Sequence, residues 1–150
     1  MIILENNVQD IKNPNEVNCI YVYKKGNNRC LIAKLVTGVT VQLTALEDLS
    51  SFPQNALIEY LNKVGASENY LKNFYVLNIH SSPLNTCLNK KQFIDFSYDG
   101  NGKETDIFVN FKNAISARVF TIKNYAFQAF NSLVVEKITK QKQDEMKKEV

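Results

Sequence analysis

Apolar residues recur at helical spacing over the last quarter of the chain and form one continuous stripe. Its members are Ala126, Ala129, Phe130, Leu133, Val134 and Ile138, with Phe127 and Val135 on its flanks. The stripe stops after Ile138, while residues that favour helices continue to the end of the sequence. The pattern predicts a long C-terminal helix that packs on the body as far as Ile138 and continues as a solvated extension over residues 139–150.

The first third of the chain alternates as a β-hairpin does. Val17–Lys24 predicts a strand with Ile20 and Val22 on one face and a second set on the other: Val17, Cys19, Tyr21 and Tyr23. The turn-forming Gly26 follows, and Cys30–Val36 predicts the partner strand. A third strand is expected over Val39–Leu43.

A second hairpin is predicted from Phe93–Tyr98 and Thr105–Phe111, which alternate in the same way. Residues 99–103 between them contain two Asx-Gly dipeptides, which adopt positive φ at little cost and favour a tight turn. Ile115–Ile122 is expected to add one more strand before the C-terminal helix.

A shorter helix is predicted in the middle of the chain. Pro53 suits its first position, Gly65 suits its end, and the stripe between them comprises Leu57, Tyr60, Leu61 and Val64. Before it, Thr44 and Glu47 have the spacing of a capping box and predict a helical turn. After it, Phe74–Ile79 is rich in aromatic and β-branched residues and favours a strand.

These elements follow the order β-β-β-α-β-β-β-β-α. Sequential hairpins imply antiparallel pairing, so we expect an α+β fold. It would have one antiparallel sheet of about six to seven strands, one short middle helix and a long C-terminal helix packed on the sheet. Residues 1–138 are expected to form a single domain and residues 139–150 its helical extension.

The charge distribution is more informative than the mild net charge of +3 on 150 residues. Between Val17 and Leu46 there is no acidic residue, whereas four cations occur there: Lys24, Lys25, Arg29 and Lys34. Aromatic residues Tyr21 and Tyr23 lie among these cations. Rings on which bases stack, beside cations that bind phosphates, are typical of single-strand binding surfaces.

The candidate nucleic-acid site therefore comprises Tyr21, Tyr23, Lys24, Lys25, Arg29 and Lys34. Phe93 is expected to extend this surface, on the face that it shares with Asp95 and Ser97. The alternative is that the two tyrosines belong to the core, because tyrosine is common in strands for reasons of packing alone.

Catalysis is the least favoured class. His80 is the only histidine, and it shows no chelating spacing with Cys19, Cys30 or Cys87. The carboxylates of the second hairpin (Asp95, Asp99, Glu104 and Asp106) could share a magnesium ion, but turn chemistry alone accounts for acidic residues at its tip. No phosphate-binding glycine loop or hydrolase motif occurs. We expect no enzyme activity, no catalytic residues, no metal and no cofactor.

The three cysteines are too few and too scattered for a disulfide framework. Because all lie in apolar, strand-like segments, we expect reduced, buried thiols and a cytoplasmic protein. The apolar run at the N-terminus is too short for a signal peptide, and no segment is long enough to cross a membrane.

The sequence thus predicts a non-catalytic binding protein, with single-stranded nucleic acid as the favoured partner and no role at a membrane. The alternative is a protein-interaction or structural subunit, such as an adaptor, inhibitor or assembly component, that acts through a sheet edge and the C-terminal helix. A homo-oligomer is one form that such a subunit could take. Salt dependence separates the two classes, because neutralising phosphates releases counterions.

Overall fold

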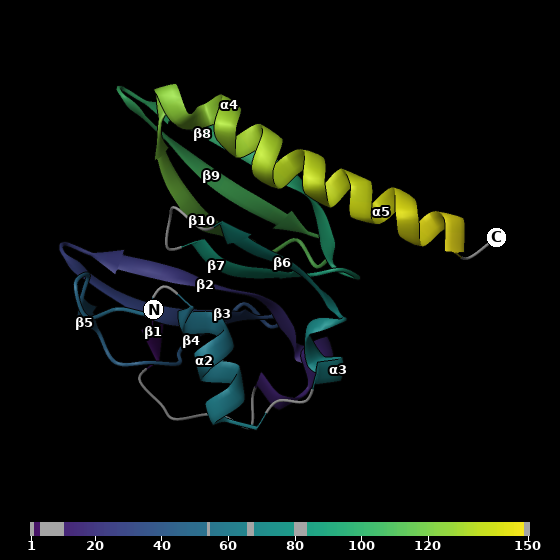
Figure 1. Ribbon diagram of the computed structural model, residues 1–150, viewed down its shortest axis with the longest axis horizontal. Helices are drawn as coiled ribbons and strands as arrows, with labels where there is room; N and C mark the ends of the chain where they lie inside the picture. Colours follow the sequence, from purple (N-terminus) through teal and green to yellow (C-terminus); the bar gives the residue numbers. More distant parts are fainter. Residues whose placement is uncertain (1, 4–10, 54, 66–67, 80–83, 149–150) are drawn as a thin grey trace.

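The strands divide between two sheets in the computed structural model, which describes residues 2–3, 11–53, 55–65, 68–79 and 84–148 (Figure 1). Within these ranges, sheet A has the strand order β1-β4-β3-β2-β7-β6 with β5 paired to β3, and sheet B has the order β10-β9-β8. All pairings are antiparallel except that of β1 with β4.

The strands of sheet A are β1 (Ile2–Ile3), β2 (Val17–Lys25), β3 (Asn28–Leu35), β4 (Thr40–Gln42), β5 (Glu47–Asp48), β6 (Phe74–Ile79) and β7 (Leu84–Asn89). Those of sheet B are β8 (Phe93–Asn101), β9 (Glu104–Phe111) and β10 (Ser116–Lys123). The helical elements are η1 (Pro14–Glu16), α2 (Ala56–Lys63), α3 (Glu68–Leu71), η2 (Asn124–Ala126), α4 (Phe127–Phe130), η3 (Asn131–Val135) and α5 (Glu136–Lys148).

The fold is α+β overall, but the predicted architecture of one sheet and one long C-terminal helix was wrong. The hairpins pair internally as expected, yet β8 leaves the turn after β7 to start sheet B instead of extending sheet A. Local alternation predicts which strands form a hairpin, whereas the sheet to which a hairpin belongs depends on contacts between distant residues.

The C-terminal helical region is divided because η3 is a π-helix between α4 and α5. The backbone N–H of Glu136 donates to the carbonyl of Asn131, the i→i+5 bond that defines a π-turn. The longest α-helical piece has 13 residues. A π-turn is wider than an α-turn, so side chains four residues apart stay close to one line across it.

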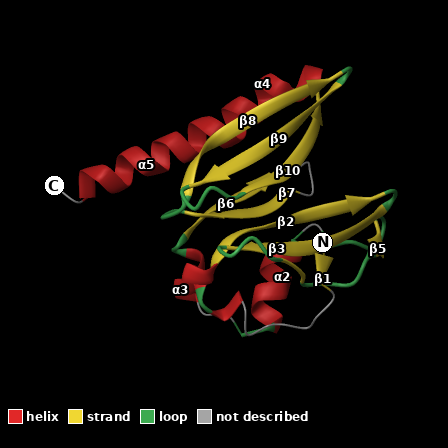
Figure 2. Ribbon diagram, turned by 180° about the vertical axis from the view of Figure 1, so that it is seen from behind, coloured by secondary structure: helices red, strands yellow, loops and turns green. Residues whose placement is uncertain are grey.

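Three residues with that spacing, Phe130, Val134 and Ile138, are buried against sheet B. Figures 1 and 2 show α4 and α5 in line across this sheet, on the side away from α2 and α3. The ring of Phe130 meets those of Phe96 and Phe120 edge to face, with centroids 5.9 Å and 5.4 Å apart. Ala129, expected in the stripe, is exposed, and the side chains of Phe127 and Leu133 lie outside the described part.

Contact with the body continues one turn past Ile138. The ammonium of Lys142 lies over the ring of Phe93, 4.5 Å from its centroid. A cation over an aromatic face is attracted by the electron density of the ring. The docked part of α5 therefore reaches into the segment that the sequence assigned to the solvated extension.

One apolar layer joins sheet A, sheet B and the C-terminal helical region. From sheet A it takes Cys19, Tyr21, Cys30, Ile32, Tyr75, Leu77 and Leu88, and from sheet B mainly Phe93, Ile107, Val109, Phe111 and Phe120. A second layer fills the other face of sheet A, which α2 covers with Leu57, Tyr60 and Leu61.

Helix α2 confirms the predicted middle helix, with two changes at its start. Its N-cap is Asn55, so Pro53 precedes the helix and does not occupy its first position. Gly65 follows the C-cap at φ +73°, the left-handed conformation that glycine adopts most readily. The helical turn predicted from Thr44 and Glu47 was wrong, because Glu47 pairs with Arg29 as part of β5.

Strand β6 confirms the prediction for Phe74–Ile79, whereas β7, its antiparallel partner, was missed. No helix in the described ranges is both long and apolar enough to cross a lipid bilayer.

The thiols of Cys19, Cys30 and Cys87 are free and fully buried, which confirms the predicted burial. Burial raises the pKa of Cys30 to about 11 and that of Cys87 to about 12. It also raises the pKa of Cys19, with a further contribution from Cys87. Because only the thiolate attacks electrophiles, all three are expected to be unreactive in the folded protein.

Replacing Phe130 by Ala is expected to lower the free energy of unfolding by about 3–5 kcal/mol, because it removes a buried ring and leaves a cavity. Gln128→Ala, at an exposed position of α4, is the control and should change it by less than about 0.5 kcal/mol. Urea denaturation followed by circular dichroism measures both. Equal effects would contradict the packing of this helical region on sheet B.

Thiol labelling with an aromatic disulfide reagent tests the buried cysteines. At pH 8 without denaturant we expect negligible reaction over minutes, and three equivalents per chain after unfolding in guanidinium without reductant. One equivalent or none after unfolding would indicate a disulfide, and rapid native labelling would contradict the burial.

Candidate ligand cleft between the two sheets

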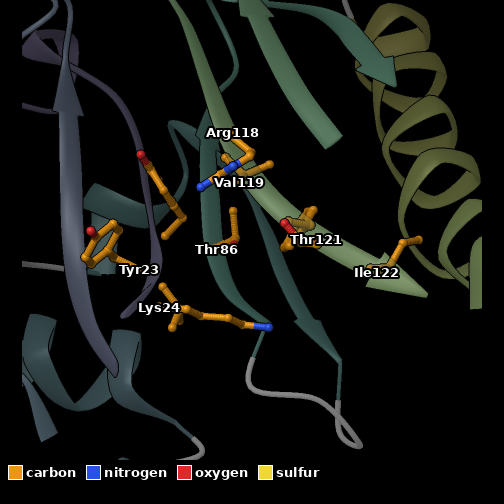
Figure 3. A pocket seen from close by; sticks show the side chains of 10 residues that line it. Tyr23, Lys24, Thr86, Arg118, Val119, Thr121 and Ile122 are labelled. Carbon is orange, nitrogen blue, oxygen red and sulfur yellow. The ribbon is translucent and has the colours of Figure 1, made fainter. Parts of the chain in front are cut away.

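Strand β2 faces two different neighbours along one edge. Its first half pairs with β7 through Cys19 and Ile20, and beyond that point no further pairing between these strands occurs in the described residues. The second half, from Tyr21 onward, pairs with β3 on its other edge and faces β10 across a cleft (Figure 3). Strand β10 is an edge strand of sheet B, so two strand edges border the cleft.

The cleft has a volume of about 100 Å³. Its lining comes from three strands: Tyr21, Val22, Tyr23 and Lys24 of β2, Thr86 of β7, and Arg118, Val119, Phe120, Thr121 and Ile122 of β10. Figure 3 shows the guanidinium of Arg118 directed from β10 toward β2, and the side chain of Lys24 reaching the opposite way. Thr86 lies between them on the floor.

Arg118 is positioned by its neighbours on sheet B. Its guanidinium is 3.7 Å from one carboxylate oxygen of Asp106, and the hydroxyl of Thr121 donates a hydrogen bond of 2.7 Å to the other. The Arg118 side chain is 59% exposed, so this ion pair adds little to stability. It orients the guanidinium at the cleft and leaves most of its five N–H donors for other partners.

Two groups of β2 have altered acidities in the cleft. Burial lowers the pKa of Lys24, and the nearby charge of Arg29 lowers it further, while Glu104 acts in the opposite direction. Burial raises the pKa of Tyr21, and the positive charge of Arg118 partly offsets this effect. The Tyr21 hydroxyl is therefore neutral at physiological pH and lies within electrostatic reach of Arg118.

Three of the six predicted site residues line this cleft: Tyr21, Tyr23 and Lys24. Tyr21 is only 8% exposed and belongs to the apolar layer, and Tyr23 is half-buried against it. The structure thus buries the ring of Tyr21, as the alternative interpretation expected, and its face is not open to a stacking base.

The other three predicted residues lie outside the cleft lining. The guanidinium of Arg29 donates to the carbonyl oxygens of Gly26 and Asn28, at 3.0 Å and 2.9 Å, and so braces the turn of its own hairpin. Lys25 is exposed at the end of β2, and Lys34, on β3, pairs in register with Cys19 of β2.

The prediction that Phe93 shares an exposed face of its strand with Asp95 and Ser97 was wrong. A β-bulge between Phe93 and Asp95 shifts the register of β8 by one residue, so Phe93 points into the apolar layer and Asp95 is exposed. A bulge between Val17 and Cys19 has the same effect in β2, where Val17 joins the second apolar layer instead of the face of Cys19 and Tyr21.

Sequence reasoning missed Thr86, Arg118 and Thr121. Arg118 and Thr121 lie in a strand that was predicted, but nothing in the local pattern indicates that this strand faces β2. Arg118 is the one cation inside Ile115–Ile122, which is the signal that could have drawn attention to it. Thr86 belongs to β7, which was not predicted.

The described residues contain no group of three or more His, Cys, Asp or Glu side chains that could hold a metal ion. Three of the four carboxylates of the second hairpin have polar partners of their own. Asp95 accepts from Asn110, Glu104 pairs with Lys123, and Asp106 is held as above. His80 lies outside the described residues.

A reciprocal amide pair ties β2 to the turn between β9 and β10. The amide of Asn18 donates to Asn113 at 3.2 Å, and that of Asn113 donates back at 2.8 Å. Asn18 is fully buried. Because Asn18 is the second residue of β2 and Asn113 precedes β10, this pair joins the two walls of the cleft at the end away from Lys24.

Comparison with known proteins gives no further guide to this cleft. No protein-family model matches the chain, and neither does a curated protein or a solved structure. The chemistry of the cleft residues is therefore the basis for a functional proposal.

Asn113→Ala is expected to lower the free energy of unfolding by about 1–3 kcal/mol, because it leaves the amide of Asn18 buried without its partner. Asn110→Ala is the matched control, since the amide of Asn110 bonds to Asp95 and Ser97 at the surface. It should cost less than about 0.5 kcal/mol. Denaturant melts that show the same loss for both variants would contradict the role of the amide pair.

Proposed function

We propose that this chain is a non-catalytic protein that binds single-stranded nucleic acid through the cleft between β2 and β10. One observation carries the proposal: Lys24 and Arg118, from two different sheets, line one cleft, and the Asp106 carboxylate that pairs with Arg118 is not part of its described lining. Two cations gathered from distant parts of the chain favour an anionic ligand, and the hydroxyls of Tyr21 and Thr121 beside them supply further polar groups.

Recognition in this proposal depends on the sugar–phosphate backbone more than on the bases. The buried ring of Tyr21 does not offer a stacking surface, and the half-buried Tyr23 offers at most one. Lys25, exposed at the end of the hairpin, extends the positive surface beyond the cleft. Binding should accordingly show weak sequence preference and strong salt dependence.

A protein partner is the second candidate, and β8 is the observation that favours it. This strand pairs only with β9 in the described part of the chain, and it exposes Ile94 and Tyr98, at 48% and 44%. An edge strand with exposed apolar side chains can accept an extended segment of another chain, including a second copy of this one. Such binding would depend far less on salt.

A cytoplasmic location accords with either candidate. Three buried free thiols are stable in a reducing compartment and would be at risk of mispairing during folding in an oxidising one. We propose the cytoplasm on that ground.

Fluorescence anisotropy with a labelled single-stranded oligonucleotide, at several salt concentrations, tests the nucleic-acid proposal. Lys24→Gln should weaken binding to all sequences and flatten the plot of log K against log salt by about 0.7, because one phosphate contact is lost. Lys63→Gln, at an exposed position of α2, removes the same charge elsewhere and should leave affinity nearly unchanged.

Absence of salt-sensitive binding to any oligonucleotide at micromolar concentration would rule out this function and favour the protein partner. Equal losses for Lys24→Gln and Lys63→Gln would show that net charge, not the cleft, determines the affinity.

A further inference from the structure

The hydroxyl of Thr86 is a polar group in an apolar place. Thr86 is 1% exposed, and its Oγ1 has no hydrogen-bond partner among the described residues. It points from the same face of β7 as Leu88 and lies opposite Leu77 of β6, and both of these belong to the apolar layer. A buried hydroxyl without a partner is costly, so on the floor of the cleft this group is available to a ligand oxygen or to a water that a ligand would displace.

Three kinds of donor line the cleft around that floor. Figure 3 places Thr86 between the guanidinium of Arg118, on the β10 side, and the side chain of Lys24, on the β2 side. A hydroxyl, a guanidinium and an ammonium on separate elements match a ligand that presents several oxygens at once. A tetrahedral phosphate does so, whereas a planar carboxylate has only two oxygens.

The size of the cleft limits what can enter it. A volume of about 100 Å³ accommodates a few water molecules or one group of comparable size. On the edge away from β2, the strand that carries Thr86 pairs with β6, so this floor belongs to a fully paired part of sheet A. A phosphate attached by a single ester bond can reach this floor end-on, whereas an internal phosphodiester must also lay the sugars on both of its sides along the cleft.

We infer that the cleft is a binding site for a phosphate monoester, the terminal phosphate of a nucleic-acid strand, held by Arg118, Lys24 and the hydroxyl of Thr86. This inference rests on the proposed function and deepens it. A phosphate monoester carries a charge of about −1.5 to −2 at neutral pH, so the cations of the cleft attract it more strongly than a singly charged group, even with Asp106 beside Arg118. An internal phosphodiester carries a single negative charge.

Paired oligonucleotides of one sequence, with either a terminal phosphate or a terminal hydroxyl, provide the test. Each end, 5′ and 3′, is examined separately by anisotropy. For one end, the wild-type chain should bind the phosphorylated oligonucleotide at least about tenfold more tightly, and this ratio should fall to nearly one in Thr86→Val and Arg118→Gln. Lys123→Gln removes the same charge from β10 outside the cleft lining and should keep the ratio, and Thr86→Ser should keep it too.

The stability of Thr86→Val separates ligand binding from a structural role. Valine has nearly the shape of threonine but no hydroxyl to leave unpartnered, so without ligand this variant should melt at the same temperature as the wild type or higher. Inorganic phosphate should raise the melting temperature of the wild type and have a smaller effect on Thr86→Val. A variant that is less stable and retains the preference for phosphorylated ends would overturn the inference.

The remaining outcomes distinguish this inference from the function on which it rests. Equal affinity of the wild type for phosphorylated and hydroxyl ends would disprove the terminal-phosphate site and leave nucleic-acid binding standing. Stabilisation by inorganic phosphate that needs Thr86 and Arg118, without binding to any oligonucleotide, would support the phosphate site and disprove the nucleic-acid partner. The same melting experiment with nucleoside monophosphates would then test for a small phosphorylated ligand. No response to phosphate and no oligonucleotide binding would reject both.

Discussion

The apolar layer between sheet A and sheet B is the constraint on which the rest of the architecture depends. No backbone pairing joins the two sheets in the described residues, so their relative position is set by side chains. Cys19, Ile32 and Leu88 meet Phe93, Val109 and Phe111 in one cluster that also takes up the C-terminal helical region. Burial of apolar surface has no preferred direction, and precise orientation therefore needs polar contacts such as that between Asn18 and Asn113.

The cleft is a consequence of this mode of assembly. Two sheets that pack through side chains can bring strand edges near each other without joining them by hydrogen bonds. Strand β2 departs from β7 after Ile20, and β10 lies opposite the edge that is left. Side chains from β2 and β7 of sheet A and from β10 of sheet B therefore line one small cleft. Polar groups can be placed there without interrupting the apolar layer beneath.

Much of the local structure could be predicted from the sequence. Both hairpins, α2 with its glycine end, and β6 follow from patterns that extend over a few residues. The bulges at Val17/Cys19 and Phe93/Asp95 could not be predicted, because an extra residue in a strand changes the facing of its neighbours while leaving the composition unchanged. Because of that single shift, the ring of Phe93 is buried, although the sequence predicted it to be exposed.

The candidate site was half predictable for a related reason. Tyr21, Tyr23 and Lys24 are adjacent in sequence and stand out by their aromatic and charged character. Thr86 and Arg118 join them only through the packing of the two sheets, and no local pattern carries that information. The acid-free composition around β2 also misled in one respect, since it suggested that Arg29 was available to a ligand when its guanidinium in fact braces the hairpin turn.

The π-helical stretch η3 determines which way the end of the chain faces. Each residue of an α-helix turns the chain by about 100°, so a chain lacking one residue of Asn131–Val135 would present different side chains to sheet B from that point on. Ile138 would rotate away from the apolar layer and Lys142 away from the ring of Phe93. The extra residue in the π-turn thus brings the apolar faces of α4 and α5 to the same side, so that both pack on sheet B.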